Sequence, residues 1–250
     1  MAKEKKYQIE SGRPLAVVTG ASRGIGAAIA EALAEEGYDL VLTCSETISE
    51  LKKLGKKLEK ECGIQCRAEQ CDVGDWQQVS DLFGTIGRLE VLINNAGISH
   101  IGLLSDMTPQ EWENLIRTNL TGSFHTCKCA IPLFLQQHSG RILNISTVWG
   151  TVGASMEVAY SASKGGLNSF TRALAKELAP SGIAVNAIAC GVIDTQMNAG
   201  FSAEEMEALR REIPADRIGK PEEVAQLALK LLQSPVYMTG QIVTMDGGWT

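Results

Sequence analysis

The stretch VVTGASRGIGAAIA (17–30) joins a short apolar run to a segment with helical periodicity. Its glycines, Gly20, Gly24 and Gly26, follow the spacing GxxxGxG. Without side chains, such a turn can be tight and its backbone can approach a pyrophosphate, which the next helix N-terminus attracts with free N–H groups and its dipole. Glycine also occurs at ordinary strand–helix corners. With a strand before it and a helix after it, the turn predicts dinucleotide binding.

Short apolar runs and amphipathic segments alternate outward from this turn along the whole chain. Because the apolar runs do not alternate with polar residues, they predict strands buried on both faces, and the alternation with helices predicts a parallel, doubly wound sheet. No linker, repeat or low-complexity stretch interrupts the pattern, so residues 1–250 are expected to form a single α/β domain. The predicted strands are Leu15–Thr19, Asp39–Thr43, Gln65–Gln70, Val91–Asn94, Arg141–Ser146, Ala184–Ile188 and Ile242–Met245. The predicted helices are Gly24–Glu36, Trp76–Phe83, Glu111–Gln137, Tyr160–Leu178 and Glu222–Leu232.

Composition and charge exclude several classes of function. The net charge of −6 argues against a nucleic-acid binder, and the lysines of KKLGKKLEKE (52–61) alternate with acids and helically spaced leucines, as on a solvated helix face. No apolar run is long enough to span a membrane, and the start, MAKEKKYQIE, lacks a signal-peptide core, so a cytoplasmic location is expected. The seven cysteines show neither a disulfide framework nor a metal-ligand pattern, which predicts buried or half-buried thiols and no metal site.

The end of the second predicted strand bears on the choice of cofactor. An NAD site normally has a carboxylate there to bind the ribose hydroxyls. This chain has Cys44 and Ser45 at that point, and Glu46 is expected to lie too far along. Arg23, inside the glycine turn, can pair with a 2′-phosphate. NADP(H) is therefore predicted, and the alternative is that Arg23 only caps a surface loop.

The motif YSASK (160–164) places a phenol and an ammonium one helical turn apart. If the segment is helical, Tyr160 and Lys164 share a face, with their β-carbons about 5–6 Å apart. At that distance the lysine charge can act on the phenol.

Four motifs together resemble the short-chain dehydrogenase/reductase family along the whole chain: TGASRGIG (19–26), NNAG (94–97), YSASK (160–164) and GQIVTMDGG (240–248). The resemblance implies a Rossmann-type domain that forms homotetramers and transfers hydride between a nicotinamide and a carbonyl or alcohol. It also implies a site built from asparagine, serine, tyrosine and lysine.

The resemblance gives roles to three residues of this chain. Tyr160 would be the general acid that protonates the carbonyl oxygen, with a pKa lowered from ~10 by Lys164 and the oxidised nicotinamide. Lys164 would also bind the nicotinamide ribose. Asn119, in IRTNLTG, would anchor a water that leads protons to the lysine. The alternatives are a capping tyrosine, a surface lysine and an ordinary helix asparagine.

The family serine is replaced in this chain. Its position, thirteen residues before Tyr160, holds Thr147, and Ser146 is adjacent. Successive strand residues point to opposite faces, so both hydroxyls are not expected to serve the site equally. Thr147 is the predicted donor, with a methyl group that restricts its rotamers and narrows the pocket. The alternative is that a distortion at the strand end presents Ser146.

The resemblance also implies cofactor contacts throughout the chain. Asp72 and Val73 would recognise adenine, and the segment CGVIDTQMN (190–198) would meet the nicotinamide amide and the pyrophosphate. Cys190 stands there in place of the family proline, which removes a φ constraint and is expected to loosen the loop. The full predicted set is Gly20, Ser22, Arg23, Gly24, Ile25, Gly26, Cys44, Ser45, Asp72, Val73, Asn95, Ala96, Gly97, Tyr160, Lys164, Val192, Ile193 and Thr195.

Two substrates remain open within the family. The chain is most similar to β-ketoacyl-acyl-carrier-protein reductases of fatty acid biosynthesis, but His138 and Ser181 replace the arginines that often dock the acidic carrier. With a negative net charge, the chain lacks the usual electrostatic steering. The stretch STVWGTVGASMEVAYSASKG (146–165) instead resembles a bacterial branch that reduces a 5-aminopentanone group on elongation factor P. Glu157 would pair with its amine, or would be only a solvated loop acid.

Two further expectations concern the substrate end and the class of protein. Trp149, Met197, Phe201 and Met206 are candidates for the substrate mouth, although Phe201 and Met206 also fit the inner stripe of a lid helix within GFSAEEMEALRREI (200–213). A non-catalytic NADP-binding regulator is the alternative from another class. Such regulators tend to lose the tyrosine or the lysine, and both are present here.

Overall fold

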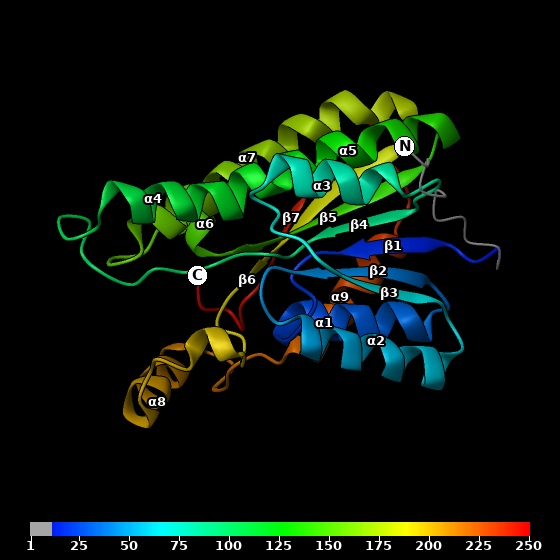
Figure 1. Ribbon diagram of the computed structural model, residues 1–250. Coiled ribbons are helices and arrows are strands. Elements are labelled where there is room, and N and C mark those ends of the chain that lie inside the picture. Colours follow the sequence, from blue (N-terminus) through cyan, green and yellow to red (C-terminus); the bar gives the residue numbers. More distant parts are fainter. Residues whose placement is uncertain (1–11) are drawn as a thin grey trace.

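The computed structural model describes residues 12–250. The predictions that concern the first eleven residues, including their membership of the domain, lie outside this range. Seven parallel strands form one sheet in the order β3-β2-β1-β4-β5-β6-β7 (Figure 1). The predicted fold class, an α/β domain with a doubly wound parallel sheet of the Rossmann type, is confirmed. The strands are β1 (Leu15–Val18), β2 (Asp39–Cys44), β3 (Cys66–Gln70), β4 (Val91–Asn94), β5 (Gly140–Thr147), β6 (Ile183–Cys190) and β7 (Ile242–Met245).

Helices cover both faces of the sheet, with α1, α2 and α9 on one side and α3, α5 and α7 on the other (Figure 1). Figure 1 also shows α4, α6 and α8 at one end of the sheet. The helices are α1 (Gly24–Glu35), α2 (Ile48–Cys62), α3 (Trp76–Gly84), α4 (Pro109–Ile116), α5 (Gly122–Gln137), α6 (Trp149–Val152), α7 (Val158–Leu178), α8 (Ala203–Glu212) and α9 (Pro221–Gln233). Short helical turns are η1 (Arg117–Thr121, a π-helix), η2 (Ala179–Ser181) and η3 (Gln196–Asn198).

Alternate residues of the central strands pack on opposite sides of the sheet. In β1, Val18 belongs to the core under α1 and α9, whereas Val17 belongs to the core under α3 and α5. Leu33 of α1 and Phe134 of α5 are fully buried in these two cores. Since both faces of the central strands are covered, their sequences are largely apolar, as predicted, although they include buried polar residues such as Asn94, Asn144 and Asn186. The edge strands β3 and β7 are only partly buried.

One predicted helix is divided in the structure. The segment predicted as Glu111–Gln137 begins two residues earlier, where Thr108 and Glu111 form a capping box around Pro109. It also contains the π-helical turn η1 before α5 begins. Such turns replace regular α-helix where an extra residue is accommodated, frequently at functional sites. Here the turn contains Asn119.

The strand order places a crevice at a defined point. The chain runs from β1 outward to β3, and then returns to β4 on the other side of β1. At such a switch point the loops that follow the two strands diverge, which leaves room for a ligand beyond their carboxyl ends. Within residues 12–250, no helix is both long and apolar enough to cross a membrane.

Candidate active site

A cavity of about 640 Å³ lies at the carboxyl ends of the strands and extends from the glycine turn to α7 and α8. The structure brings together in its wall all the predicted catalytic and cofactor-binding residues except Gly26 and Asn119. The predicted residues that line it are Gly20, Ser22, Arg23, Gly24, Ile25, Cys44, Ser45, Asp72, Val73, Asn95, Ala96, Gly97, Ser146, Thr147, Tyr160, Lys164, Val192, Ile193 and Thr195.

The glycine turn is held against the end of β4. Asn95 Nδ2 donates to the carbonyl oxygens of Thr19 (3.0 Å) and Gly20 (2.9 Å), and Thr19 Oγ1 accepts from the backbone N–H groups of Asn95 and Ala96, both at 3.0 Å. A Cβ on Gly26 would lie 2.4 Å from Asn95 Nδ2 and from the Gly20 oxygen. Gly26 therefore shapes the turn from behind, which explains why it does not line the cavity.

The start of α1 suits a pyrophosphate. Gly20 has φ +63°, and a Cβ there would lie 2.8 Å from Ala96 Cα, so the bare backbone follows the cavity wall. Arg23 at the N-cap forms no side-chain cap, and the first turn of α1 contains no acid. The first N–H groups of the helix are thus left for an anion, with no negative charge beside them. These residues fit the phosphates of a dinucleotide.

The adenosine end combines hydroxyls with charges of both signs. Arg23 and Ser45 line the cavity, and so does Glu46, which was expected to lie too far along the chain for the ribose hydroxyls. Thr47, which was not predicted, also lines this end and donates from Oγ1 to Ser22 Oγ at 2.6 Å. The carboxyl end of β2 turns back towards the glycine turn, so residues beyond Ser45 remain within the site.

Arg117 positions the predicted adenine-binding acid. Its Nη1 donates to Asp72 Oδ2 at 2.7 Å, and Asp72 Oδ1 accepts from the Gly74 N–H at 2.8 Å. Both oxygens of the Asp72 carboxylate are therefore held in place. Arg117 comes from η1 and lines the cavity itself, although no sequence motif had pointed to it.

Tyr160 and Lys164 lie on the first turns of α7, on one wall of the cavity. Lys164 is 5% exposed, and its Nζ donates to the Ile145 oxygen at 2.8 Å and lies 5.9 Å from the centre of the Tyr160 ring. Burial without an acidic partner among the described residues lowers the pKa of Lys164 to about 8. The ammonium is thus charged at neutral pH but close to its titration point.

The lowered pKa expected for Tyr160 included the charge of the oxidised nicotinamide, and without cofactor the pKa of Tyr160 is raised instead. Burial raises the pKa of the phenol well above its usual value, and the nearby Glu157 carboxylate raises it further. A phenolate enclosed in protein loses its hydration, and Lys164 directs its Nζ to a backbone carbonyl, so the cost of desolvation dominates. Without cofactor, these surroundings therefore favour the protonated phenol.

Asn119 braces the site from behind the cavity wall. It is fully buried, its Oδ1 accepts from the Ile98 N–H at 2.8 Å, and its Nδ2 donates to the Ile98 oxygen at 2.9 Å and to Ser163 Oγ at 3.1 Å. Ser163 Oγ in turn donates to the Tyr160 carbonyl at 2.8 Å. This chain of bonds joins the loop after β4 to the turn of α7 that holds Tyr160.

Ser146 and Thr147 both line the cavity at the end of β5. Ser146 is 3% exposed, and its Oγ has no hydrogen-bond partner among the described residues. Thr147 Oγ1 accepts a long bond, 3.4 Å, from the Trp149 N–H. Both hydroxyls therefore have spare donor capacity at the end of β5.

Cys190 lies at the end of β6, where the resemblance led us to expect a looser loop. It pairs in register with Thr147 on one side and Met245 on the other, and its oxygen accepts from the Val148 N–H at 2.9 Å. The sheet therefore holds this backbone position without proline. Burial raises the pKa of the thiol to about 12, so it stays neutral. All seven cysteines are free and buried or half-buried, as predicted.

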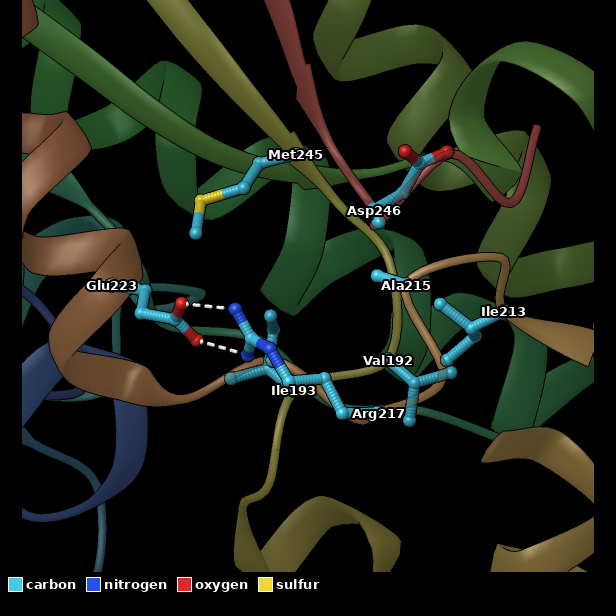
Figure 2. A pocket seen from close by; sticks show the side chains of 10 residues that line it. Val192, Ile193, Ile213, Ala215, Arg217, Glu223, Met245 and Asp246 are labelled. Atoms are coloured by element: carbon cyan, nitrogen blue, oxygen red, sulfur yellow. Dashed lines mark hydrogen bonds and ion pairs between the residues drawn. The ribbon is translucent and has the colours of Figure 1, made fainter. Parts of the chain in front are cut away.

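A smaller cavity of about 50 Å³ lies under the segment that follows β6. Figure 2 shows the two-bond ion pair of Arg217 with Glu223 (2.7 and 2.5 Å) beside Ile193, with Val192 further to the right. Ile193 also forms a β-bridge with Gly219. These contacts fix the segment that the resemblance assigns to the nicotinamide.

The predicted substrate end of the large cavity carries large apolar side chains from distant parts of the chain. Trp149, Met197 and Phe201 line it as expected, but Met206 does not. Leu209, one helical turn further along α8, lines it instead. Helical periodicity alone did not tell which of these two positions faces the site.

Two other residues of this end bear on substrate choice. Trp249, which was not predicted, lines the cavity from the C-terminal segment. Glu157 is half-buried in the wall, where burial raises the pKa of its carboxyl and the Trp149 side chain hydrogen-bonds it. The described residues form no ion pair with Glu157.

A dinucleotide cradle, a half-buried tyrosine and a buried lysine share one cavity on a doubly wound sheet, which defines a nicotinamide-dependent oxidoreductase. Residues 14–206 match the family model described as short chain dehydrogenase, and the chain belongs to that family.

Relatives with different names align with nearly the whole chain. Carbonyl reductase family member 4 of Danio rerio is 43% identical over 240 residues, which cover 94% of this chain and 97% of the relative. The uncharacterized oxidoreductase YmfI of Bacillus subtilis is 37% identical over 236 residues, covering 94% and 98%. The 3-oxoacyl-[acyl-carrier-protein] reductase FabG of Aquifex aeolicus is 35% identical over 239 residues, covering 94% and 96%.

Proposed function

We propose that this protein is an NADPH-dependent keto reductase of the 3-oxoacyl-acyl-carrier-protein reductase type. The observation that carries the proposal is the position of Tyr160 and Lys164, which line the same cavity as the glycine turn. A bound nicotinamide would supply the hydride that reduces the carbonyl carbon. The residues of the chain then have to hold the carbonyl and deliver one proton to its oxygen.

Tyr160 is the proposed proton donor. Its raised pKa keeps the hydroxyl protonated until charge develops on the carbonyl oxygen. Lys164 supplies the positive charge that stabilises the phenolate left after transfer, and its bond to the Ile145 oxygen fixes the ammonium. Asn119 holds the loop and the helix turn that meet at this point.

The pH profile of reduction tests the role of Lys164. Because the pKa of Lys164 is lowered to about 8, the ammonium is charged below that pH and neutral above it. We therefore expect kcat/KM for ketone reduction to be constant near neutrality and to fall as the pH rises through about 8. A profile that stays flat until free lysine titrates, near ~10.4, would contradict this assignment.

The donor to the carbonyl oxygen is proposed to be Thr147. We expect Thr147→Val to lower kcat/KM by roughly 10–1000-fold, because a hydroxyl aimed at the developing oxyanion is lost. Ser146→Ala is the matched control and should keep most of the activity. The reverse result, with Ser146→Ala inactive and Thr147→Val active, would assign the role to Ser146, whose buried oxygen is unpaired.

NADP(H) preference is proposed to come from Arg23. A charge-assisted bond to the 2′-phosphate predicts that Arg23→Ala weakens NADPH binding by roughly 10–100-fold and leaves NADH binding nearly unchanged. Arg172→Ala, at an exposed position of α7, is the control. Fluorescence titration with both cofactors measures the effect. Equal affinities of the unmodified protein for NADH and NADPH would refute the preference, and Glu46 would then be the candidate for the ribose hydroxyls.

The physiological ketone has a second candidate. Glu157 lines the cavity without a cation partner among the described residues, which favours a substrate with an amine, such as the 5-aminopentanone group on elongation factor P. Incubation with NADPH and either a 3-oxoacyl carrier substrate or the modified factor distinguishes the two. Glu157→Gln should impair only the amine-bearing substrate. Absence of NADPH oxidation with any ketone would favour the non-catalytic regulator.

The remaining expectations about the protein stay predictions. Homotetramer formation is proposed from the family resemblance, and light scattering in solution tests it. A cytoplasmic location is likewise proposed.

A further inference from the structure

The C-terminal segment contributes an aromatic wall to the cavity. Trp249 lies four residues beyond β7 and lines the cavity together with Trp149 of α6. The two indole rings are 4.8 Å apart between centroids and inclined by 60°. Such tilted pairs are favourable arrangements of aromatic rings. In Figure 1 the C-terminus lies between α6 and α8, at the end of the sheet where the cavity opens.

A folded turn holds Trp249 in place. The Asp246 carboxylate accepts from the N–H groups of Gly248 and Thr250 and from Thr250 Oγ1, each at 2.9 Å. Figure 2 shows this carboxylate turned away from the ion pair of Arg217 and Glu223. The turn therefore encloses a charged acceptor, and the chain end is not a free tail.

The backbone before Trp249 is also fixed. Gly247 and Gly248 have φ +71° and +85°, a conformation that residues with a Cβ rarely adopt. A Cβ on Gly247 would lie 2.7 Å from Ile213 Cγ2, and the Gly247 oxygen accepts from the Ala215 N–H at 3.0 Å. The turn is thus attached to the segment that follows α8. Leu209 of α8 itself lines the cavity.

We propose that Trp249 is a specificity-determining residue that packs against the apolar part of the ketone next to the reacting carbonyl. The inference rests on the proposed keto reductase function. Trp149, Met197, Phe201 and Leu209 line the same cavity, and these four side chains offer mainly carbon and sulfur atoms to a substrate. An aromatic side chain at this point strengthens the binding of substrates with an apolar chain or ring, because contact with it removes their apolar surface from water.

The test is a series of 3-oxoacyl thioesters of increasing chain length. We expect Trp249→Ala to raise KM for the longer members by roughly 10-fold, with little change for the shortest member and for NADPH. Trp249→Phe should have a KM close to that of the wild type, because phenylalanine keeps an aromatic contact with the substrate. This result would show that the effect of Trp249→Ala comes from lost contact and not from misfolding. Tyr237→Ala removes a side chain that is 99% exposed and is the control.

Two readouts do not depend on turnover. The dissociation constant of each thioester from the NADP⁺-loaded protein should change as KM does. The exciton couplet of the two indoles in circular dichroism should vanish in Trp249→Ala and in Trp149→Phe, and should weaken in Asp246→Asn if the turn positions Trp249.

The outcomes separate this inference from the proposed function. If Trp249→Ala binds the whole series as the wild type does, while Tyr160→Phe is inactive, the inference is overturned and the function stands. If the wild-type protein neither binds nor reduces any of the thioesters, both are overturned. A rise in KM that is equal for all chain lengths would also overturn the inference, because contact with the apolar part must depend on its size.

Discussion

Replacing Tyr160 by phenylalanine is expected to lower kcat for NADPH-dependent ketone reduction by about 10²–10⁴-fold. The substitution removes the only hydroxyl that the proposed mechanism uses as a proton donor and keeps the buried ring that packs on the cavity wall. Because phenylalanine has no proton to transfer, no change in the pH of the assay should restore activity. The decrease in nicotinamide absorbance with a 3-oxoacyl substrate measures the effect.

The control for this substitution is Tyr237→Phe, since Tyr237 is 99% exposed and far from any proposed role. Both variants should unfold at nearly the temperature of the wild type and bind NADPH as it does. If Tyr160→Phe retains wild-type kcat, another group donates the proton, and the role proposed for Tyr160 is wrong. Loss of NADPH binding would instead show that the hydroxyl serves the cofactor.

Gly26→Ala is expected to weaken NADPH binding strongly and to reduce the free energy of unfolding by about 1–3 kcal/mol. The added Cβ would lie 2.4 Å from Asn95 Nδ2 and from the Gly20 oxygen, so the hydrogen bond between these two groups has to break. Gly20 then moves away from Ala96, and the wall that faces the phosphates is displaced. Urea unfolding and a fluorescence titration with NADPH measure the two effects.

The matched control is Gly84→Ala at the end of α3, where nothing lies within 4 Å of the new Cβ. Alanine is the better helix former, so this variant should be as stable as the wild type or more stable by up to about 1 kcal/mol. If Gly26→Ala behaves like Gly84→Ala, the turn accommodates a side chain, and its contact with Asn95 does not shape the cofactor site.

The strands were predictable because their signal is local. β4 and β7 have the predicted bounds, three of the others differ by one residue at one end, and β5 and β6 extend by one or two residues at both ends. A strand that is buried on both faces needs mostly apolar residues in succession, and such a run can be recognised in the sequence. The helix around Asn119 was harder, since the π-turn depends on how the chain packs beside Ile98 and α7.

Several site residues had no local signal. Arg117, Thr47 and Trp249 reach the cavity because elements distant in the sequence end at the same edge of the sheet. Met206 and Leu209 lie one helical turn apart on α8, and only the packing of that helix decides which of them lines the cavity.

The amino-acid sequence by itself determined the fold class, the dinucleotide turn and the pairing of Tyr160 with Lys164, because each depends on residues near one another in the chain. Only the tertiary structure decided the ionisation of that pair. The pKa of a side chain depends on how fully the folded protein removes it from water and on which groups face it. Tyr160 and Lys164 are surrounded by residues of β5, β6 and α7. Because these elements are distant in the chain, their effect on the two pKa values cannot be inferred from any short stretch of sequence.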